Sequence, residues 1–211
     1  MQLADKTNVL CYVVRHGRTT LNADGCFRGN SNPPLDSVGI RQAEMVAKLL
    51  EPVEISHIFC SDRLRATTTA EEIGKSAKLP IHRSESLRAL DVGDFSGKLR
   101  TKESEAALQV FIDHPSTDIP GGESLNNFKS RIRPCITEAV DIALKCGVPT
   151  IVVAHSSIVH EVGSMLYNDH KSILVEPGGI VAIYLNNGKV VADPIFRPTN
   201  TPPGTRSETI S

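Results

Sequence analysis

The chain has 211 residues, of which 40% are hydrophobic, enough for the core of one domain. It carries 23 basic and 24 acidic residues, a formal net charge of −1, so composition gives no general attraction to nucleic acid or membranes. Any anion site must therefore be local. Five scattered cysteines without a CxxC pair favour reduced thiols over a disulfide framework or a zinc site.

No signal-like N-terminus and no apolar stretch long enough to cross a bilayer is found, so we expect a cytoplasmic protein. We expect one domain over 1–197, with residues 98–120 as a small insertion over the site. The Pro/Thr/Ser-rich segment 198–211 is predicted to be a flexible tail.

The first part of the chain alternates strand-like and helix-like segments. The apolar run Val9–Val14 predicts a buried strand, and a Gly/Asn/Pro-rich loop follows over 19–34. Further strands are predicted over 55–60 and, at a sheet edge, over 79–82. Asp36 is expected to cap a helix. The expected inward face of that helix is Ile40, Ala43, Ala47 and Leu50.

Two more helices are predicted before residue 120. Ser61 or Asp62 is expected to cap the first of them. After a glycine-punctuated loop over 87–97, a helical stretch is predicted over 101–113. The inward face of the helix that Ser61 or Asp62 caps is expected to be Ala66, Ala70, Ile73 and Ala77.

A long helix should begin at Glu123 and Ser124, after a Pro-Gly-Gly turn, and Pro134 should kink or split it. Its expected inward face is Leu125, Phe128, Ile132, Ile136, Ala139 and Ala143. A buried strand is predicted over 150–154, followed by a helix that Ser156 or Ser157 caps.

The segments 180–185 and 190–192, joined by Asn186-Asn187-Gly188, predict a β-hairpin. The alternation of strands and helices predicts an α/β fold. We expect a three-layer α/β/α sandwich, with a mostly parallel central sheet, helices on both faces and an antiparallel edge hairpin.

Polar residues follow three of the predicted strands where each ends. Arg15 and His16 follow the first, Arg65 lies in the helical turn after the second, and His155 and Ser156 follow the third. Each alone is typical of a solvated charge or a hydrogen-bonded strand end. Because parallel strands end at one edge of a sheet, and helix N-termini there favour anions, together they predict a phosphate-sized site.

Several segments resemble, in chain order, the motifs of one family. They are 15–19 with Asn22, 28–36, 39–43, 61–66 with 69–70, 120–124 and 154–155. Over about 9–197 the chain is similar to the histidine phosphatase superfamily, the phosphoglycerate-mutase-like enzymes.

The resemblance implies in-line phosphoryl transfer through a phosphohistidine on His16, which water then hydrolyses. It implies that Arg15 and Arg65 bind the transferring oxygens, that His155 donates to them, and that Asn22 adds a neutral donor. Imidazole has a pKa of about 6.5, and the arginines oppose a positive charge on it, so a neutral nucleophile is expected. No metal and no cofactor is expected, because the arginines supply the positive charge.

The chain departs from the family pattern at the proton donor. Ala89 stands where the family commonly has a glutamate; Asp91 is nearest to that place, and Asp94 and Glu123 are alternatives. A positioned acid is worth about 10²- to 10⁴-fold in rate. Its loss favours phosphohistidine, acyl phosphate, pyrophosphate or aryl phosphate substrates. Ser156 stands where the family often has glycine, and caps the helix or reaches the phosphate.

We therefore expect a phosphatase acting on phosphorylated small molecules. A phosphoglycerate-mutase-type transferase is one alternative, and a catalytically weakened phosphate-binding module is another, because of Ala89. No nucleic-acid or membrane partner is expected; the oligomeric state stays open, with a homodimer as one alternative. The loops at 19–34 and 89–97 and the segment 101–120 should set specificity. Their candidate pocket residues are Phe27, Arg28 and Phe95, and for Phe27 and Phe95 a place in the core is an equal alternative.

Overall fold

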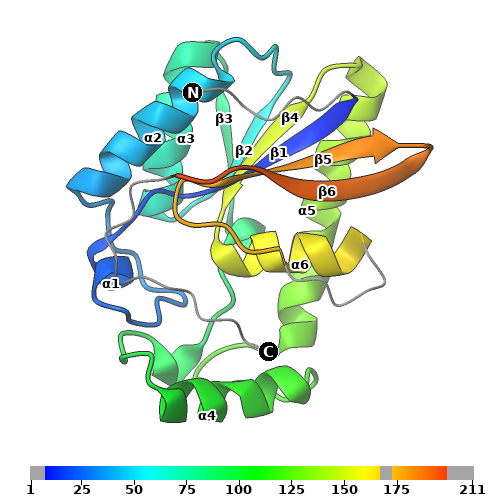
Figure 1. Ribbon diagram of the computed structural model, residues 1–211. Coiled ribbons are helices and arrows are strands. Elements are labelled where there is room, and N and C mark those ends of the chain that lie inside the picture. The colour runs from blue at the N-terminus through cyan, green and yellow to red at the C-terminus, as the bar shows by residue number, and fades with distance from the viewer. Residues whose placement is uncertain (1–7, 167–172, 199–211) are drawn as a thin grey trace.

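The computed structural model describes residues 8–166 and 173–198. These residues form one sheet of six strands in the order β3-β2-β4-β1-β5-β6 (Figure 1). The strands are β1 (Val9–Arg15), β2 (Ile58–Ser61), β3 (Ile81–Ser84), β4 (Thr150–Ala154), β5 (Ile180–Asn186) and β6 (Lys189–Phe196). The first four run parallel, and the β5–β6 hairpin adds an antiparallel edge. The predicted mostly parallel sheet is confirmed.

Helices cover both faces of this sheet. The helices of the described residues are α1 (Thr20–Ala23), α2 (Ser37–Leu50), α3 (Leu64–Ala77), α4 (Lys102–Asp113), α5 (Leu125–Cys146) and α6 (Ser156–Leu166), with short 3₁₀ turns η1 (Glu85–Leu87) and η2 (Gly93–Phe95). α2 and α3 pack on one face, and α5 and α6 on the other. The three-layer α/β/α architecture is therefore confirmed.

The central strands are apolar throughout because both of their faces are buried. In β1, Cys11 and Val13 belong to the core under α5 and α6, whereas Tyr12 and Val14 belong to the core under α2 and α3. Successive side chains of a strand point to opposite faces, so a strand covered on both sides needs an unbroken apolar run. This explains why β1 appears in the sequence as a continuous apolar segment.

Two predicted helix features hold. Of the two alternatives at Pro134, the split does not occur and the kink stays a prediction. Asp36 caps α2, its Oδ1 accepting from the backbone N–H groups of Val38 (2.9 Å) and Gly39 (2.8 Å). Ser124 caps α5. Pro134, however, lies inside α5, which runs unsplit over 22 residues. Buried residues on both sides of the proline hold the two halves in one helix, outweighing the lost backbone hydrogen bond.

Two further local predictions are wrong. Arg63, and neither Ser61 nor Asp62, occupies the N-cap position of α3, and its side chain makes no capping hydrogen bond. The Asp62 carboxylate is instead engaged by Arg88 (Nε–Oδ1 2.8 Å). Ile40 is 44% exposed, because the buried face of α2 runs through Gly39 and Ala43 and leaves Ile40 outside it. The predicted strands at 55–60 and 79–82 exist, but β2 and β3 lie slightly further along the chain.

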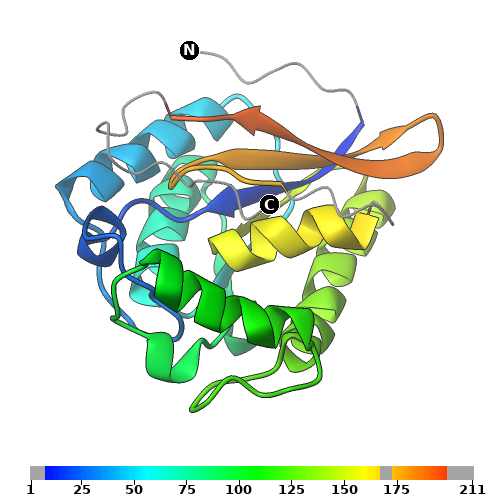
Figure 2. The same ribbon diagram turned by 60° about the horizontal axis from the view of Figure 1, so that its bottom comes forward.

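The predicted segment 98–120 contains α4, which lies beyond the carboxyl ends of the parallel strands (Figures 1 and 2). Ring contacts join it to the rest of the fold: Phe27 meets Phe95 with centroids 5.9 Å apart, and Phe95 meets Phe111 at 6.4 Å. Phe27 is therefore a core residue, and through Phe95 it connects the loop after α1 to α4.

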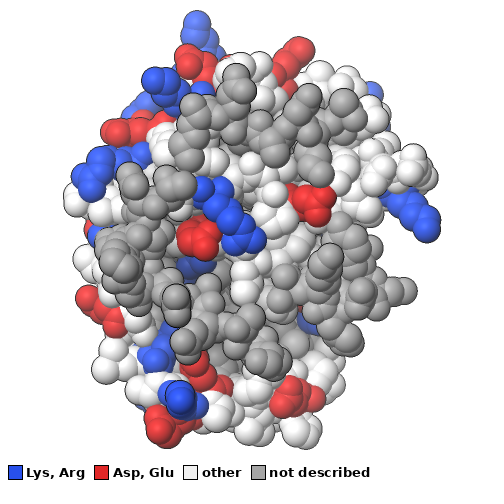
Figure 3. Space-filling view, viewed as in Figure 1, with Lys and Arg blue, Asp and Glu red and all other residues white. Residues whose placement is uncertain are grey.

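Other sequence expectations concern charge, thiols and the end of the chain. On the face drawn in Figure 3, basic and acidic side chains are interspersed. All five cysteines, each in the described part of the chain, are free thiols. In that part, no helix is long and apolar enough to cross a membrane. Except for Pro198, the predicted tail lies outside the described residues.

The packing of α5 generates a stability prediction. Ile132 is 0% exposed and Leu144, on the same helix, is 51% exposed. Ile132→Ala should lower the free energy of unfolding by about 2–5 kcal/mol, because it leaves a cavity in the core. Leu144→Ala, the matched control, should change it by about 0.5 kcal/mol or less. Urea unfolding followed by circular dichroism measures both, and equal effects would contradict the described packing.

Candidate active site

The parallel pairing of β1 and β4 brings two histidines together. Arg15 is paired with Ala154, and the backbone N–H of His16 donates to the Ala154 carbonyl (3.0 Å). His16 and His155 therefore follow neighbouring strands in the same register. Their ring centroids lie 5.1 Å apart, and the two side chains are almost completely buried.

A hydrogen bond fixes the tautomer of His16. Its Nδ1 lies 2.6 Å from the Gly17 carbonyl oxygen. A carbonyl only accepts, so Nδ1 carries the hydrogen, and in the neutral ring the free lone pair is on Nε2. Gly17 is held in turn, because its N–H donates to Thr69 Oγ1 (3.1 Å). A Cβ at Gly17 would lie 2.3 Å from the Gly39 carbonyl oxygen, so this loop packs tightly on the start of α2.

Arg65 enters the site from the first turn of α3 and has no exposed surface. Its guanidinium donates to the carbonyl oxygens of Ser31 (2.6 Å) and Gly29 (3.3 Å), which ties it to the loop after α1. Thr69 Oγ1 donates to the Arg65 carbonyl (2.8 Å). The same hydroxyl thus links the Arg65 backbone to the loop that carries His16.

Several buried nitrogens of the site lack a hydrogen-bond partner among the described residues. They are Arg15 Nε, Arg65 Nε and both ring nitrogens of His155. Arg15 also donates through Nη1 to the Val175 carbonyl (2.6 Å), on the segment before β5. Buried polar atoms are nearly always hydrogen-bonded in folded proteins, so this group of donors fits an oxygen-rich ligand.

The electrostatic setting favours neutral imidazoles beside charged guanidinium groups. Burial lowers the pKa of His16 well below 6.5, and Arg65 acts in the same direction. Burial and Arg65 also lower the pKa of His155 well below 6.5. Burial lowers the pKa of Arg15 and of Arg65 to about 9, which leaves both cationic at neutral pH. The site therefore combines two neutral imidazoles with fixed positive charge.

Two predicted phosphate ligands have well-defined surroundings. Asn22 completes the capping box of α1, its Oδ1 accepting from the Thr19 N–H (3.1 Å) and hydroxyl (3.0 Å). Ser156 opens α6 directly after His155, where backbone N–H groups of a helix lack intrahelical partners. The predicted capping of α6 by Ser156 or Ser157 is wrong, because both lie inside the helix and Ser157 Oγ accepts from the Leu90 N–H (3.1 Å).

The Glu123 carboxylate belongs to a clamp around the loop after η1. It pairs with Arg131 (Nε–Oε2 2.9 Å) and accepts from the Asp91 N–H (2.9 Å). Arg131 also donates to the carbonyl oxygens of Ser86, Arg88 and Ala89, at 2.8 Å each. This engagement explains why Glu123 fits a structural role better than that of a proton donor.

The other two candidate proton donors, Asp91 and Asp94, lie in turns. Asp91 Oδ1 accepts from the Gly93 N–H (3.1 Å). Asp94 lies against Gly121. A Cβ atom at position 121 would be only 2.7 Å from Asp94 Oδ1. The principal causes of the lowered pKa values of His16 and His155 are burial and nearby cations. The acid role of Asp91 stays a prediction.

Sequence reasoning gave no role to some residues of the site. Arg28, placed there only as a candidate pocket residue, lowers the pKa of His16 and His155 more than Arg15 does. Thr69 was part of a motif without a function; its place one helical turn after Arg65 is the signal that could have identified it. Arg131 donates to the carbonyl of Ala89, about 40 residues away in the sequence, and a contact at that separation has no local sequence signal.

The lowered histidine pKa values predict a loss of stability in acid. As the pH falls below 6.5, His16 and His155 take up protons in the unfolded chain but not in the folded one. The free energy of unfolding should therefore fall by up to about 1.4 kcal/mol per pH unit for each histidine.

Urea unfolding at pH 7.5 and 5.5, in phosphate-free buffer, measures this effect. The His16→Asn/His155→Asn double variant should lose less stability between these two pH values than the unchanged protein does. An equal loss in both would contradict the buried neutral histidines.

Comparison with known proteins agrees with the fold and shows the family of the chain. The family model of the histidine phosphatase superfamily (branch 1) matches residues 11–173. A probable phosphoglycerate mutase GpmB of Proteus mirabilis is 32% identical over 133 residues, which cover 61% of this chain and 62% of that protein. The protein of the same name from Yersinia pestis is 31% identical over 148 residues, 68% of each chain.

Solved structures of similar fold include phosphatases and a mutase. A mycobacterial glucosyl-3-phosphoglycerate phosphatase complexed with VO3 matches with a TM-score of 0.74 at 21% identity, over 90% of this chain and 99% of that one. The phosphoglycerate mutase of Bacillus anthracis matches with a TM-score of 0.74 at 25% identity, over 89% and 93%. With the family match over more than half of its length, this chain belongs to the histidine phosphatase superfamily.

Proposed function

We propose that the chain is a phosphatase that transfers a phosphoryl group from a phosphorylated small molecule to His16 and then to water. The orientation of His16 carries this proposal. Its Nδ1–H is held by the Gly17 carbonyl (2.6 Å), so Nε2 is left as the nucleophilic atom. Simple phosphate binding does not need an imidazole held in this tautomer, which argues against a binding module.

In the first step, Nε2 of His16 attacks phosphorus, and the bond from phosphorus to the leaving oxygen breaks. The leaving oxygen keeps the electron pair and must take up a proton. The unpartnered donors of Arg15, Arg65 and His155 hold the three transferring oxygens. In the second step, water attacks the phosphohistidine, releases inorganic phosphate and restores the neutral ring.

The site lacks an acidic side chain at position 89 that could protonate the leaving oxygen. Position 89 lies near His155. The next residue, Leu90, donates its N–H to Ser157 on the first turn of α6. Arg131, which binds the Ala89 carbonyl, also lowers the pKa of His155. Alanine there cannot donate a proton. We therefore propose substrates whose leaving group departs without much protonation: phosphohistidine, acyl phosphates, pyrophosphates or aryl phosphates.

A mutase is the second candidate, favoured by the names of the curated relatives. A mutase must keep its phosphohistidine away from water until the group returns to the bound substrate. The segment 98–120 offers one helix for such a cover, and none of the residues of α4 is fully buried. An assay of monophosphoglycerate interconversion distinguishes the two candidates directly.

The proposed nucleophile predicts a covalent intermediate. Incubation with ³²P-labelled acetyl phosphate, followed by quenching in base, should trap label that is stable to base and labile to acid. His16→Ala should abolish the label and reduce phosphatase activity to background, because Nε2 is lost. His114→Ala is the matched control, since His114 is an exposed histidine whose Nδ1 contacts the Val110 carbonyl (2.8 Å). Label that persists in His16→Ala would refute the assignment.

The missing donor predicts a dependence on the leaving group. Ala89→Glu should raise kcat for an alkyl phosphate by about 10²-fold, with a much smaller change for p-nitrophenyl phosphate, because only the alkoxide needs protonation. Ala89→Gln, of the same size without an acidic proton, should give no such gain. Unchanged alkyl turnover in Ala89→Glu means that the donor was not limiting. A loss of alkyl turnover in Asp91→Asn would instead support Asp91 as the acid.

A further inference from the structure

The peptide group between Gly17 and Arg18 is hydrogen-bonded on both of its edges. Its carbonyl oxygen, that of Gly17, accepts the hydrogen of His16 Nδ1 (2.6 Å). Its N–H, that of Arg18, donates to Oε1 of Gln42 on α2 (2.8 Å). A trans peptide group is rigid and planar, and its N–H and C=O point in opposite directions. One rigid plane therefore joins the imidazole of His16 on one edge to the amide of Gln42 on the other.

The side chain of Gln42 is fixed along its length. It is 4% exposed, and a Cβ added at Gly178 would lie only 3.0 Å from the Cβ of Gln42. Gly178 in turn donates its N–H to the carbonyl oxygens of Arg15 (3.0 Å) and His16 (3.1 Å). Gln42 is thus held between the segment before β5 and the loop that carries His16, so its amide has little freedom to turn away from the Arg18 N–H.

Stability does not explain an amide at position 42. Nε2 of Gln42 is buried and has no hydrogen-bond partner among the described residues. Leaving a buried donor unpaired costs at least as much free energy as one neutral hydrogen bond returns. An apolar side chain of similar length would avoid this cost. The role of Gln42 must therefore come from what its Oε1 does for the peptide group between Gly17 and Arg18.

Other contacts already fix the path of the backbone here. The Gly17 N–H donates to Thr69 Oγ1 (3.1 Å), which holds the preceding peptide group. The Arg18 carbonyl accepts from the Asp36 N–H (3.0 Å), which holds the following one. The contribution that is left to Gln42 is the orientation and the polarity of the single peptide plane that faces His16 Nδ1.

We infer that Gln42 is a positioning residue that keeps the hydrogen of His16 on Nδ1, and the lone pair on Nε2, through the Gly17–Arg18 peptide. This inference rests on the proposed function, in which Nε2 attacks phosphorus. The bond to Gln42 stops the plane from turning the Gly17 carbonyl away from Nδ1. It also polarises the peptide, which makes that carbonyl a stronger acceptor. A stronger bond at Nδ1 raises the basicity of Nε2.

The tautomer of His16 tests the inference without a substrate. In ¹⁵N-labelled protein at pH 8 and without phosphate, long-range ¹H–¹⁵N spectra distinguish the Nδ1–H form from the Nε2–H form, and His16→Ala identifies the signals of His16. The unchanged protein should show the Nδ1–H form alone. Gln42→Met, which keeps the length of the side chain without the amide oxygen, should show both forms. Gln42→Glu, which keeps an acceptor oxygen, should show the Nδ1–H form alone.

Activity should follow the tautomer. Gln42→Met should lower kcat for an aryl phosphate by about tenfold or more, because part of the protein then carries a hydrogen on the attacking atom. KM should change much less, since Gln42 acts on the nucleophile. A rise in KM with kcat unchanged would mean that Gln42 binds the substrate, and the inference would be overturned.

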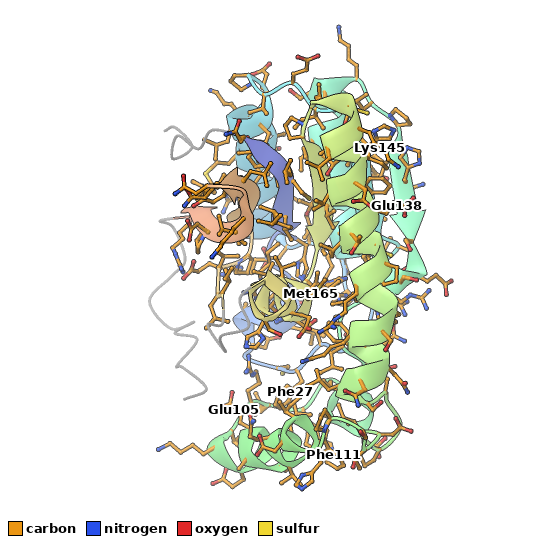
Figure 4. All side chains as sticks on the ribbon, turned by 90° about the vertical axis from the view of Figure 1, so that its right-hand side faces the viewer. Phe27, Glu105, Phe111, Glu138, Lys145 and Met165 are labelled. Carbon is orange, nitrogen blue, oxygen red and sulfur yellow. The ribbon has the colours of Figure 1, made fainter. Side chains whose placement is uncertain are left out.

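Thr150→Val is the matched control for the loss of a buried hydrogen bond. The Thr150 hydroxyl is buried and donates to the Ala139 carbonyl (3.1 Å). Figure 4 shows Lys145 at the end of α5 that is remote from α4. Thr150 begins β4 just after this end of α5, at the opposite end of the strand from His155. Thr150→Val should lower the midpoint of urea unfolding but leave the tautomer of His16 and kcat unchanged.

Two outcomes of the spectra would overturn the inference. One is that Gln42→Met keeps His16 wholly in the Nδ1–H form, and the other is that Thr150→Val changes the tautomer as much as Gln42→Met does. Should Gln42→Met not fold, Gln42→Glu decides. A carboxylate is a stronger acceptor than an amide, so the signals of the Arg18 amide proton and the His16 Nδ1 proton should both move downfield. A shift of the Arg18 proton alone would overturn the inference.

The same measurements separate this inference from the proposed function. If the unchanged protein hydrolyses no phosphate ester and His16 takes up no label, the phosphatase function fails. The spectra still decide the role of Gln42 in that case, because they need neither turnover nor a bound ligand.

Discussion

The pairing of β1 with β4 is the constraint on which the site depends. One backbone hydrogen bond, from His16 to Ala154 (3.0 Å), sets the register that places His16 and His155 side by side. The two strands are separated by more than 130 residues in sequence, and both are buried on both faces. A shift of one residue would turn every side chain of a strand to the opposite face, so the hydrophobic core also fixes the positions of the catalytic candidates.

Burying several arginines at one edge of the sheet opposes folding, because cations lose hydration and repel one another. Arg15, Arg28 and Arg65 all have lowered pKa values for these two reasons. Backbone carbonyls, those of Val175, Ser31 and Gly29, replace part of the lost hydration. A bound anion would replace the remaining lost hydration of these arginines, so binding of an anion stabilises the folded protein.

The sequence was informative wherever a local pattern determines the structure. The apolar strands, the Asp36 cap and the α/β alternation follow from periodicity, and the strand ends identified His16 and His155. Long-range contacts account for what was missed. Asp62 is engaged by Arg88 and does not cap α3, and Pro134 does not split α5 because the core holds both halves.

The same limit applies within the site. The surroundings of Arg28 depend on the pairing of two segments about 70 residues apart, for which the sequence carries no periodic signal. The resemblance predicted Arg65 as a phosphate ligand, but its contacts with the loop at 29–31 could only be seen in the fold.

The clamp formed by Arg131 has a consequence for how this enzyme family can diversify. Arg131 holds the loop through the carbonyl oxygens of Ser86, Arg88 and Ala89, and carbonyls are common to all amino acids. The path of the backbone is thus independent of the side chain at position 89. On the proposed mechanism, a single codon change at position 89 removes or restores the acid on an unaltered scaffold, so descendants of one ancestor could move between classes of phosphate ester without first passing through a misfolded intermediate.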